Sequence, residues 1–145
     1  MKKNDLFELE ITDLGNDGEG IGKADGFTFF VKDTVPGDRI RASVMKLKKN
    51  YGFARLVEVL SPSKDRIEPV CETARACGGC TLQAVSYERQ LLFKEDRVRS
   101  CLKRIGGFED PAVLPILGME DPFRYRADYK RADDRDQSCA CARAL

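Results

Sequence analysis

The sequence contains no histidine among its 145 residues. Histidine is the usual acid or base near neutral pH and a common metal ligand, so its absence excludes His-based catalysis and His-containing metal sites. The sequence also lacks an excess of charge of either sign, because 25 basic and 24 acidic residues leave a net charge of only +1. This balance excludes a uniformly basic nucleic-acid binder and an acidic solvating tail, so any electrostatic function must be local.

Long apolar runs are also absent. No stretch approaches the ~20 apolar residues of a membrane-spanning helix, and the N-terminal residues 1–13 lack an apolar core of signal-peptide length. We therefore expect a cytoplasmic protein without a membrane partner. Six cysteines are nevertheless present, and in the cytosol clustered cysteines bind metal more often than they form disulfides.

Residues 1–60 have the pattern of short strands separated by turns. Phe7, Leu9 and Ile11 alternate with polar residues, which is the period of two expected of a half-buried strand. Glycines cluster in LGNDGEGIG, and a proline-glycine pair at 36–37 has the order favoured at the centre of a type II turn. The strands are too few for a sandwich, so we predict a five-stranded OB-like barrel.

The rest of the chain departs from the strand pattern. Residues 61–69 carry two prolines and four charges, and we place the domain boundary there. Residues 61–126 contain a cysteine-rich loop, one long helix and an irregular segment. Residues 127–145 have no aliphatic run, and we expect an atypical, disordered tail. The predicted fold is thus mainly β followed by α.

The predicted helix extends from about residue 87 to residue 105. Ser86 can cap its N-terminus, and the glycine pair at 106–107 supplies the stop. Cys101 falls at the edge of the apolar stripe, so we expect a buried small hydrophobic residue there. Residues 111–117 after the helix are apolar and predict a short strand.

Within the barrel, the charges are segregated. Residues 39–57, here called the basic strip, have a charge of +6 over 19 residues and no acidic residue. Its cations are Arg39, Arg41, Lys46, Lys48, Lys49 and Arg55. Such a strip can neutralise several phosphates, and Tyr51 and Phe53 interleave with it as stacking platforms for unpaired bases do. The alternative is that the lysines form a solvated hairpin tip and Phe53 belongs to the core.

Three cysteines follow with the spacing C-x5-C-x2-C, at Cys71, Cys77 and Cys80. The glycines at 78–79 allow the backbone to fold back, so these thiolates can converge on one metal centre. Without histidine, a fourth ligand must be a cysteine, a carboxylate or a group outside this chain. This favours an iron-sulfur cluster over zinc, although a four-cysteine zinc site has the same thiolate chemistry. A loop of reduced cysteines without metal is the remaining alternative.

The run DGEGIGKADGFTFFVKDTVPGDRIRASVMKLKKNYGFARLVEVL, followed by CETARACGGCTLQ, is similar to a known arrangement. It resembles the RNA-binding TRAM domain and the cysteine loop of bacterial 23S rRNA uracil-5-methyltransferases, and PFRYR resembles the start of that family's next element. The resemblance covers about residues 5–126. It implies that Cys71, Cys77 and Cys80 are three of four ligands of a 4Fe-4S cluster, and that the partner is RNA, in particular 23S rRNA.

The resemblance ends before the family's domain for S-adenosylmethionine, the catalytic cysteine and the fourth cluster ligand. We therefore assign no catalytic residue, expect that cofactor only in the complete enzyme, and expect no methyl transfer by this chain alone. We also expect a monomer that does not bind DNA.

The alternative function is a free-standing RNA-binding module with a zinc or iron-sulfur knuckle. In that case Cys139 and Cys141 of the tail would complete the metal site. A thiol redox protein is disfavoured, because the C-x2-C spacing does not lie in a βαβ context.

Overall fold

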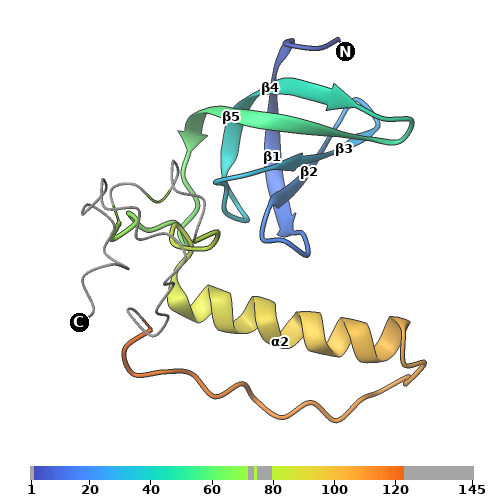
Figure 1. Cartoon of the computed structure of the whole chain (residues 1–145), viewed down its shortest axis with the longest axis vertical. Coiled ribbons are helices and arrows are strands. Elements are labelled where there is room, and N and C mark those ends of the chain that lie inside the picture. Colours follow the sequence, from blue (N-terminus) through green and yellow to red (C-terminus); the bar gives the residue numbers. More distant parts are fainter. Residues whose placement is uncertain (1, 72–73, 75–79, 123–145) are drawn as a thin grey trace, which may run out of the picture. The chain divides into compact units, whose positions relative to one another are not determined.

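The structure is a computed structural model that describes residues 2–71, 74 and 80–122. The chain divides into two compact units, Met1–Val85 and Ser86–Leu145. Five strands and the loop segments after them form the described part of the first unit, and one helix with an extended segment forms that of the second (Figure 1). The predicted order of β structure followed by α structure is confirmed. The tail expected at 127–145 lies outside the described residues, and the boundary expected at 61–69 stays a prediction.

Five strands form a closed barrel in the first unit. They are β1 (Leu6–Leu14), β2 (Gly20–Ala24), β3 (Phe27–Val31), β4 (Arg39–Leu47) and β5 (Tyr51–Ser61). Neighbouring strands follow the order β1-β2-β3-β5-β4, and β4 also pairs with β1. All pairs are antiparallel except β3 with β5, which is parallel. The predicted five-stranded barrel is therefore confirmed.

Alternation along the strands builds the core of this barrel. Ile40, Ala42 and Val44 of β4 are completely buried, whereas Arg39, on the opposite face of the same strand, is exposed. The same period places Ile11 and Phe29 in the interior, because successive side chains of a strand point to opposite faces. An inward apolar set of this kind determines which side chains remain available on the outside.

A close contact between β3 and β5 determines their register. Phe29 pairs with Gly52, and a Cβ atom at Gly52 would lie only 2.6 Å from Cε1 of the Phe29 ring. Only glycine leaves room there for the buried ring. The next pair in the ladder is Phe30 with Phe53, which brings two outward aromatic residues side by side.

The turn before β4 has the predicted type. Gly37 has a φ of 91°, and the N–H of Asp38 donates to the carbonyl oxygen of Val35 at 3.0 Å. These are the positive φ and the closing hydrogen bond of a type II turn with Pro36 at its first central position.

The second unit contains the helix α2 (Tyr87–Arg104). The hydroxyl oxygen of Ser86 accepts a hydrogen bond from the Arg89 N–H at 3.4 Å, and Gly107 has a φ of 72° just beyond the last turn. The predicted cap, helix and stop are confirmed. No helix in the described residues is long and apolar enough to span a membrane.

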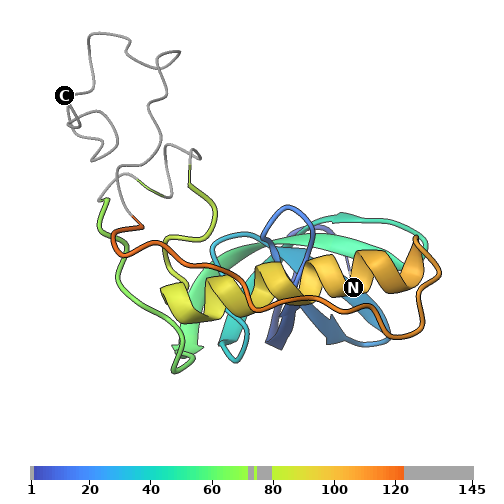
Figure 2. The same ribbon diagram turned by 90° about the horizontal axis from the view of Figure 1, so that it is seen from below.

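An extended segment after α2 runs back along the helix in both views (Figures 1 and 2). The Met119 N–H donates to the Tyr87 hydroxyl oxygen at 2.8 Å, and the Ile116 N–H donates to a Glu95 carboxylate oxygen at 3.3 Å. These contacts fall on the first half of α2. Residues 111–117 belong to no β-ladder in the described part of the chain, so the strand predicted there is wrong.

The helix buries none of its residues completely. Cys101 is exposed, so the prediction that it is buried is wrong. The physical reason is that nothing in the described part of the second unit covers the Cys101 side chain. An apolar stripe becomes a core only where another element covers it.

Candidate nucleic-acid interface

Three aromatic side chains gather on the outer face of the barrel, and we call Phe30, Tyr51 and Phe53 the aromatic cluster. Their ring centroids lie 5.7 to 5.9 Å apart, within the range of favourable aromatic contacts. Tyr51 is 39% exposed and Phe53 is 41% exposed. The alternative in which Phe53 belongs to the core is therefore wrong, and the rings present a surface to solvent.

The backbone pattern explains why these rings meet on the outside. Tyr51 and Phe53 are two residues apart on β5, so they share one face, while Gly52 between them faces the core. Phe30 joins them from β3 because it is the register partner of Phe53. Sequence reasoning missed Phe30, although its place next to the inward Phe29 is a signal for an outward ring.

The aromatic cluster borders an open depression of about 520 Å³. The depression is lined by Asp17, Glu19, Thr28, Phe30, Asn50, Tyr51 and Phe53. Aromatic faces, a hydroxyl, an amide and two carboxyl groups therefore converge on one place. This mixture of apolar surface and a few polar groups is typical of a small-ligand or base-binding surface.

Four cations of the basic strip lie on the strands and the turn beside the aromatic cluster. Lys46 of β4 is the ladder partner of Phe53, and Arg55 follows Phe53 on the same face of β5. Lys48 and Lys49 are exposed in the turn between β4 and β5. Among the residues that the structure describes, none of these four forms an ion pair, so their charges are available to an anionic ligand.

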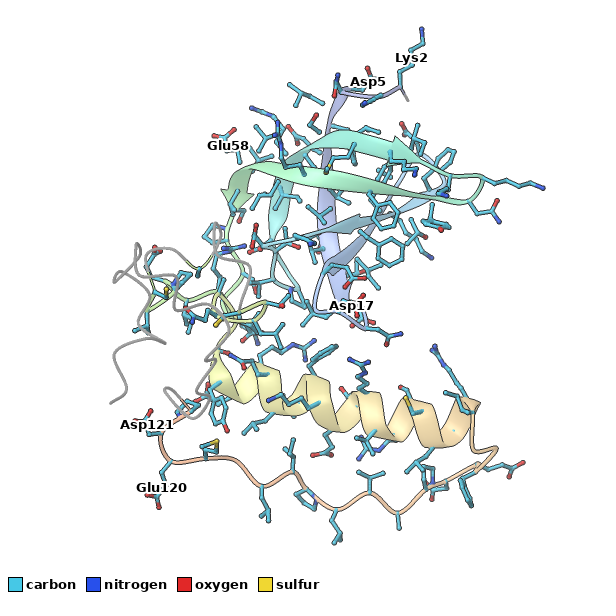
Figure 3. All side chains as sticks on the ribbon, in the orientation of Figure 1. Lys2, Asp5, Asp17, Glu58, Glu120 and Asp121 are labelled. Carbon is cyan, nitrogen blue, oxygen red and sulfur yellow. The ribbon has the colours of Figure 1, made fainter. Side chains whose placement is uncertain are left out.

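The other two cations of the basic strip have carboxylate partners. Arg39 contacts Glu8 at 3.0 Å, and Arg41 contacts Glu8 at 3.5 Å and Glu58, which is labelled in Figure 3, at 3.0 Å. These partners come from β1 and β5, which flank β4 in the sheet. The free positive charge of the strip is therefore concentrated near the aromatic cluster. The pairs themselves are exposed and contribute only about 0–1 kcal/mol each to stability.

Two of the three predicted cysteine ligands are described. Cys71 is 3% exposed and Cys80 is half-buried, whereas Cys77 lies outside the described residues. Cys139 and Cys141 lie outside them as well. Within the described ranges, no group of three or more cysteine or acidic residues is arranged to hold a metal ion. The iron-sulfur cluster thus stays a prediction.

A buried carboxylate anchors the segment that leads to these cysteines. Asp38 is completely buried and accepts hydrogen bonds from the N–H groups of Val35 at 2.7 Å and Ser63 at 2.9 Å. It also forms an ion pair with Arg66 at 2.6 Å. A buried charge needs such complete pairing to be tolerated. Sequence reasoning did not single out Asp38.

The segment from Arg66 to Cys71 contacts the segment from Gln83 to Val85, and we call these contacts the clamp of the cysteine loop, residues 71–80. The Arg66 backbone forms a bridge with Val85, and the Ile67 N–H donates to the Ala84 carbonyl oxygen at 2.9 Å. Further along, the Cys71 N–H donates to the side-chain oxygen of Gln83 at 3.3 Å. The two segments that carry Cys71 and Cys80 are therefore joined to each other and, through Asp38, to the barrel.

Comparison with known proteins identifies the barrel. The family model described as the TRAM domain matches residues 2–57. These residues are therefore similar to the TRAM domain. The matched range contains the whole aromatic cluster and all six cations of the basic strip, whereas the cysteine loop follows it.

Relatives extend the similarity beyond the TRAM domain. The chain is 48% identical to an uncharacterized RNA methyltransferase of Clostridium acetobutylicum over 128 residues, which cover 87% of this chain and 28% of the relative. An uncharacterized RNA methyltransferase of Listeria monocytogenes is 48% identical over 126 residues, with the same shares. The chain is thus homologous to RNA methyltransferases over most of its own length and spans about 28% of theirs.

A solved structure is similar in sequence as well. The tRNA (uracil-54, C5)-methyltransferase of Pyrococcus abyssi, in complex with S-adenosyl-L-homocysteine, is 32% identical, with a TM-score of 0.43. The match covers 74% of this chain and 23% of that one.

Proposed function

We propose that the TRAM domain of this chain binds unpaired RNA and serves as the RNA-binding part of an RNA methyltransferase. The observation that carries the proposal is the exposed aromatic cluster beside four cations without ion-pair partners among the described residues. Rings stack on bases of any sequence, and the cations neutralise the phosphates between them. Homology to RNA methyltransferases supports the same function.

The aromatic cluster and the four cations contribute to RNA binding through different energetic effects. Each base stacked on an aromatic ring contributes about 1–3 kcal/mol. The four cations act through counterion release, and four phosphate contacts to a single strand predict that log K falls with log salt with a slope of about −3. Stacking should therefore survive at high salt, while the contribution of the cations should disappear.

The finer part of the proposal concerns the complete enzyme. There the TRAM domain would hold 23S rRNA while a uracil, flipped out of its helix, is methylated at carbon 5 in a pocket formed by other residues. S-adenosylmethionine would bind outside the present residues. Tighter binding to 23S rRNA fragments than to tRNA of equal length would support this target, and the reverse order would refute it.

We also propose that Cys71, Cys77 and Cys80 hold an iron-sulfur cluster. Three thiolates without any histidine form a soft donor set that suits iron and sulfide, and the burial of Cys71 protects its sulfur from solvent. The donor set is one thiolate short of the four that a 4Fe-4S cluster takes, so the fourth ligand must come from elsewhere. Such a cluster would stabilise the cysteine loop and would not itself transfer electrons in the reaction.

Anisotropy titrations of a labelled single-stranded RNA against the purified chain, over a range of salt concentrations, test RNA binding. The double variant Lys48→Gln/Lys49→Gln should reduce the salt slope by about 1.4, because it removes two phosphate contacts. The matched control Lys3→Gln/Lys64→Gln removes the same charge at exposed positions outside the basic strip. Equal slopes for the two double variants, or no binding by the wild-type chain, would refute the proposal.

Metal analysis after anaerobic purification tests the cluster. About four irons and four sulfides per chain would support a complete 4Fe-4S cluster, and their loss in Cys71→Ser would confirm the ligand. About one zinc per chain would favour the free-standing module with a zinc knuckle. The absence of both metals from chain refolded with iron, sulfide and zinc would refute a metal site.

A further inference from the structure

One side of the depression next to the aromatic cluster is formed by a well-defined acidic loop. The Gly15 N–H donates to the Glu19 carbonyl oxygen at 2.7 Å, and the Asp17 N–H donates to a Glu19 carboxylate oxygen at 3.1 Å. Gly18 has a φ of 81°, which lets the loop turn tightly. These bonds fix the loop and occupy one carboxylate oxygen of Glu19. The Asp17 carboxylate forms no hydrogen bond or ion pair with the described residues.

We propose that this depression makes the TRAM domain selective for guanine, with Asp17 as the group that recognises the base edge. The proposal rests on the proposed RNA binding and adds the class of base to it. Phe30, Tyr51 and Phe53 would stack on the ring, while Asp17 accepts hydrogen bonds from its edge.

The donor pattern of the bases favours guanine. An ionised carboxylate can only accept hydrogen bonds, and it accepts two in parallel when two donors lie side by side. Guanine presents an N1–H and a 2-amino group next to each other on its pairing edge. Adenine and cytosine present one amino group beside a ring nitrogen that accepts, and uracil presents one N–H between two carbonyls. Carbonyl oxygens and ring nitrogens that face Asp17 repel its carboxylate. Uracil has two such carbonyls beside its single N–H, so it fits worst.

The charge distribution also favours the orientation in which the base edge of the nucleotide faces Asp17. Cations lie on the β4 and β5 side of the aromatic cluster, at Lys46 and Arg55, whereas Asp17 and Glu19 lie on the loop that leads into β2. Strands β3 and β5 separate β2 from β4 in the barrel order. A nucleotide would place its phosphate toward the cations and its base edge toward the carboxylates, because the opposite orientation brings two anions together.

A panel of labelled oligonucleotides tests this selectivity. One oligouridylate carries a central guanosine, a second carries inosine there, and a third carries only uridine. Guanosine should bind about tenfold more tightly than uridine, which is the size of one good bidentate base contact. Inosine lacks the 2-amino group and should fall between them. The ratio between guanosine and uridine should collapse toward one in Asp17→Asn.

The matched control is Asp25→Asn, which removes the same charge in an exposed turn that does not line the depression. Asp25 has a φ of 48°, a conformation that asparagine tolerates. Both variants should raise the affinity for oligouridylate slightly, because each removes a negative charge, but only Asp17→Asn should change the ratio. Equal binding of all three oligonucleotides, or an unchanged ratio in Asp17→Asn, would overturn the selectivity and leave RNA binding intact. Failure of the wild-type chain to bind any of them would overturn the proposed function itself.

Discussion

The barrel and the helix α2 are both predicted from the periodicity of their apolar residues, but only the barrel buries those residues. In the barrel, every strand pairs on both sides, and apolar residues such as Phe29 and Ile40 are completely buried. In α2, the predicted cap and stop are confirmed, yet Val98 is 51% exposed, and Ile105 at the C-cap is 85% exposed. Local signals determine where an element begins and ends, whereas burial requires a second element to cover the apolar face.

The largest expected effect comes from replacing one apolar residue in each unit, buried in the barrel and exposed at the end of α2. Phe29→Ala should destabilise the barrel by about 4 kcal/mol, because it removes a buried ring and leaves a cavity. Ile105→Ala should change stability by less than about 0.5 kcal/mol, because the side chain is exposed. Chemical denaturation measures both values. A cost for Ile105→Ala as large as that for Phe29→Ala would show that the end of α2 is covered in solution.

A smaller effect is expected at the anchor of the cysteine loop. Asp38→Ala should cost about 3 kcal/mol, because it removes one partner of a buried ion pair. Hydrogen exchange at the Ile67 amide should accelerate, since its bond to Ala84 depends on the position of Arg66. The control is Glu8→Ala, which breaks exposed pairs and should cost about 0–1 kcal/mol. Unchanged protection of Ile67 in Asp38→Ala would show that the clamp holds without its anchor.

The smallest effect is expected at the start of α2. Ser86→Ala should destabilise the helix by about 1 kcal/mol, because the Arg89 N–H loses its acceptor, and Ser86→Asp should retain the helix. Ser100→Ala is the control at an exposed interior position, where alanine is the better helix former. Helix content by circular dichroism measures the difference. If Ser86→Ala and Ser100→Ala behaved alike, tertiary contacts rather than the cap would determine where α2 begins.

Pairing between strands accounts for what sequence reasoning missed at the candidate interface. Arg39 and Arg41 count as cations of the basic strip, but Glu8 and Glu58 pair with them across the sheet. No local pattern connects residue 8 with residue 39. Asp17 was missed for the same reason, because only the closed barrel brings its loop to the depression beside the aromatic cluster.

The sequence by itself determined the local features of this protein. The period of two along β4, the turn at 36–37 and the Ser86 cap depend on residues that are close in the chain, so their physics is visible there. Only the tertiary structure decided which cations are neutralised, which rings reach solvent and whether Cys101 is covered. Those properties depend on neighbours from distant segments, because charge pairing and burial are set by distance in space.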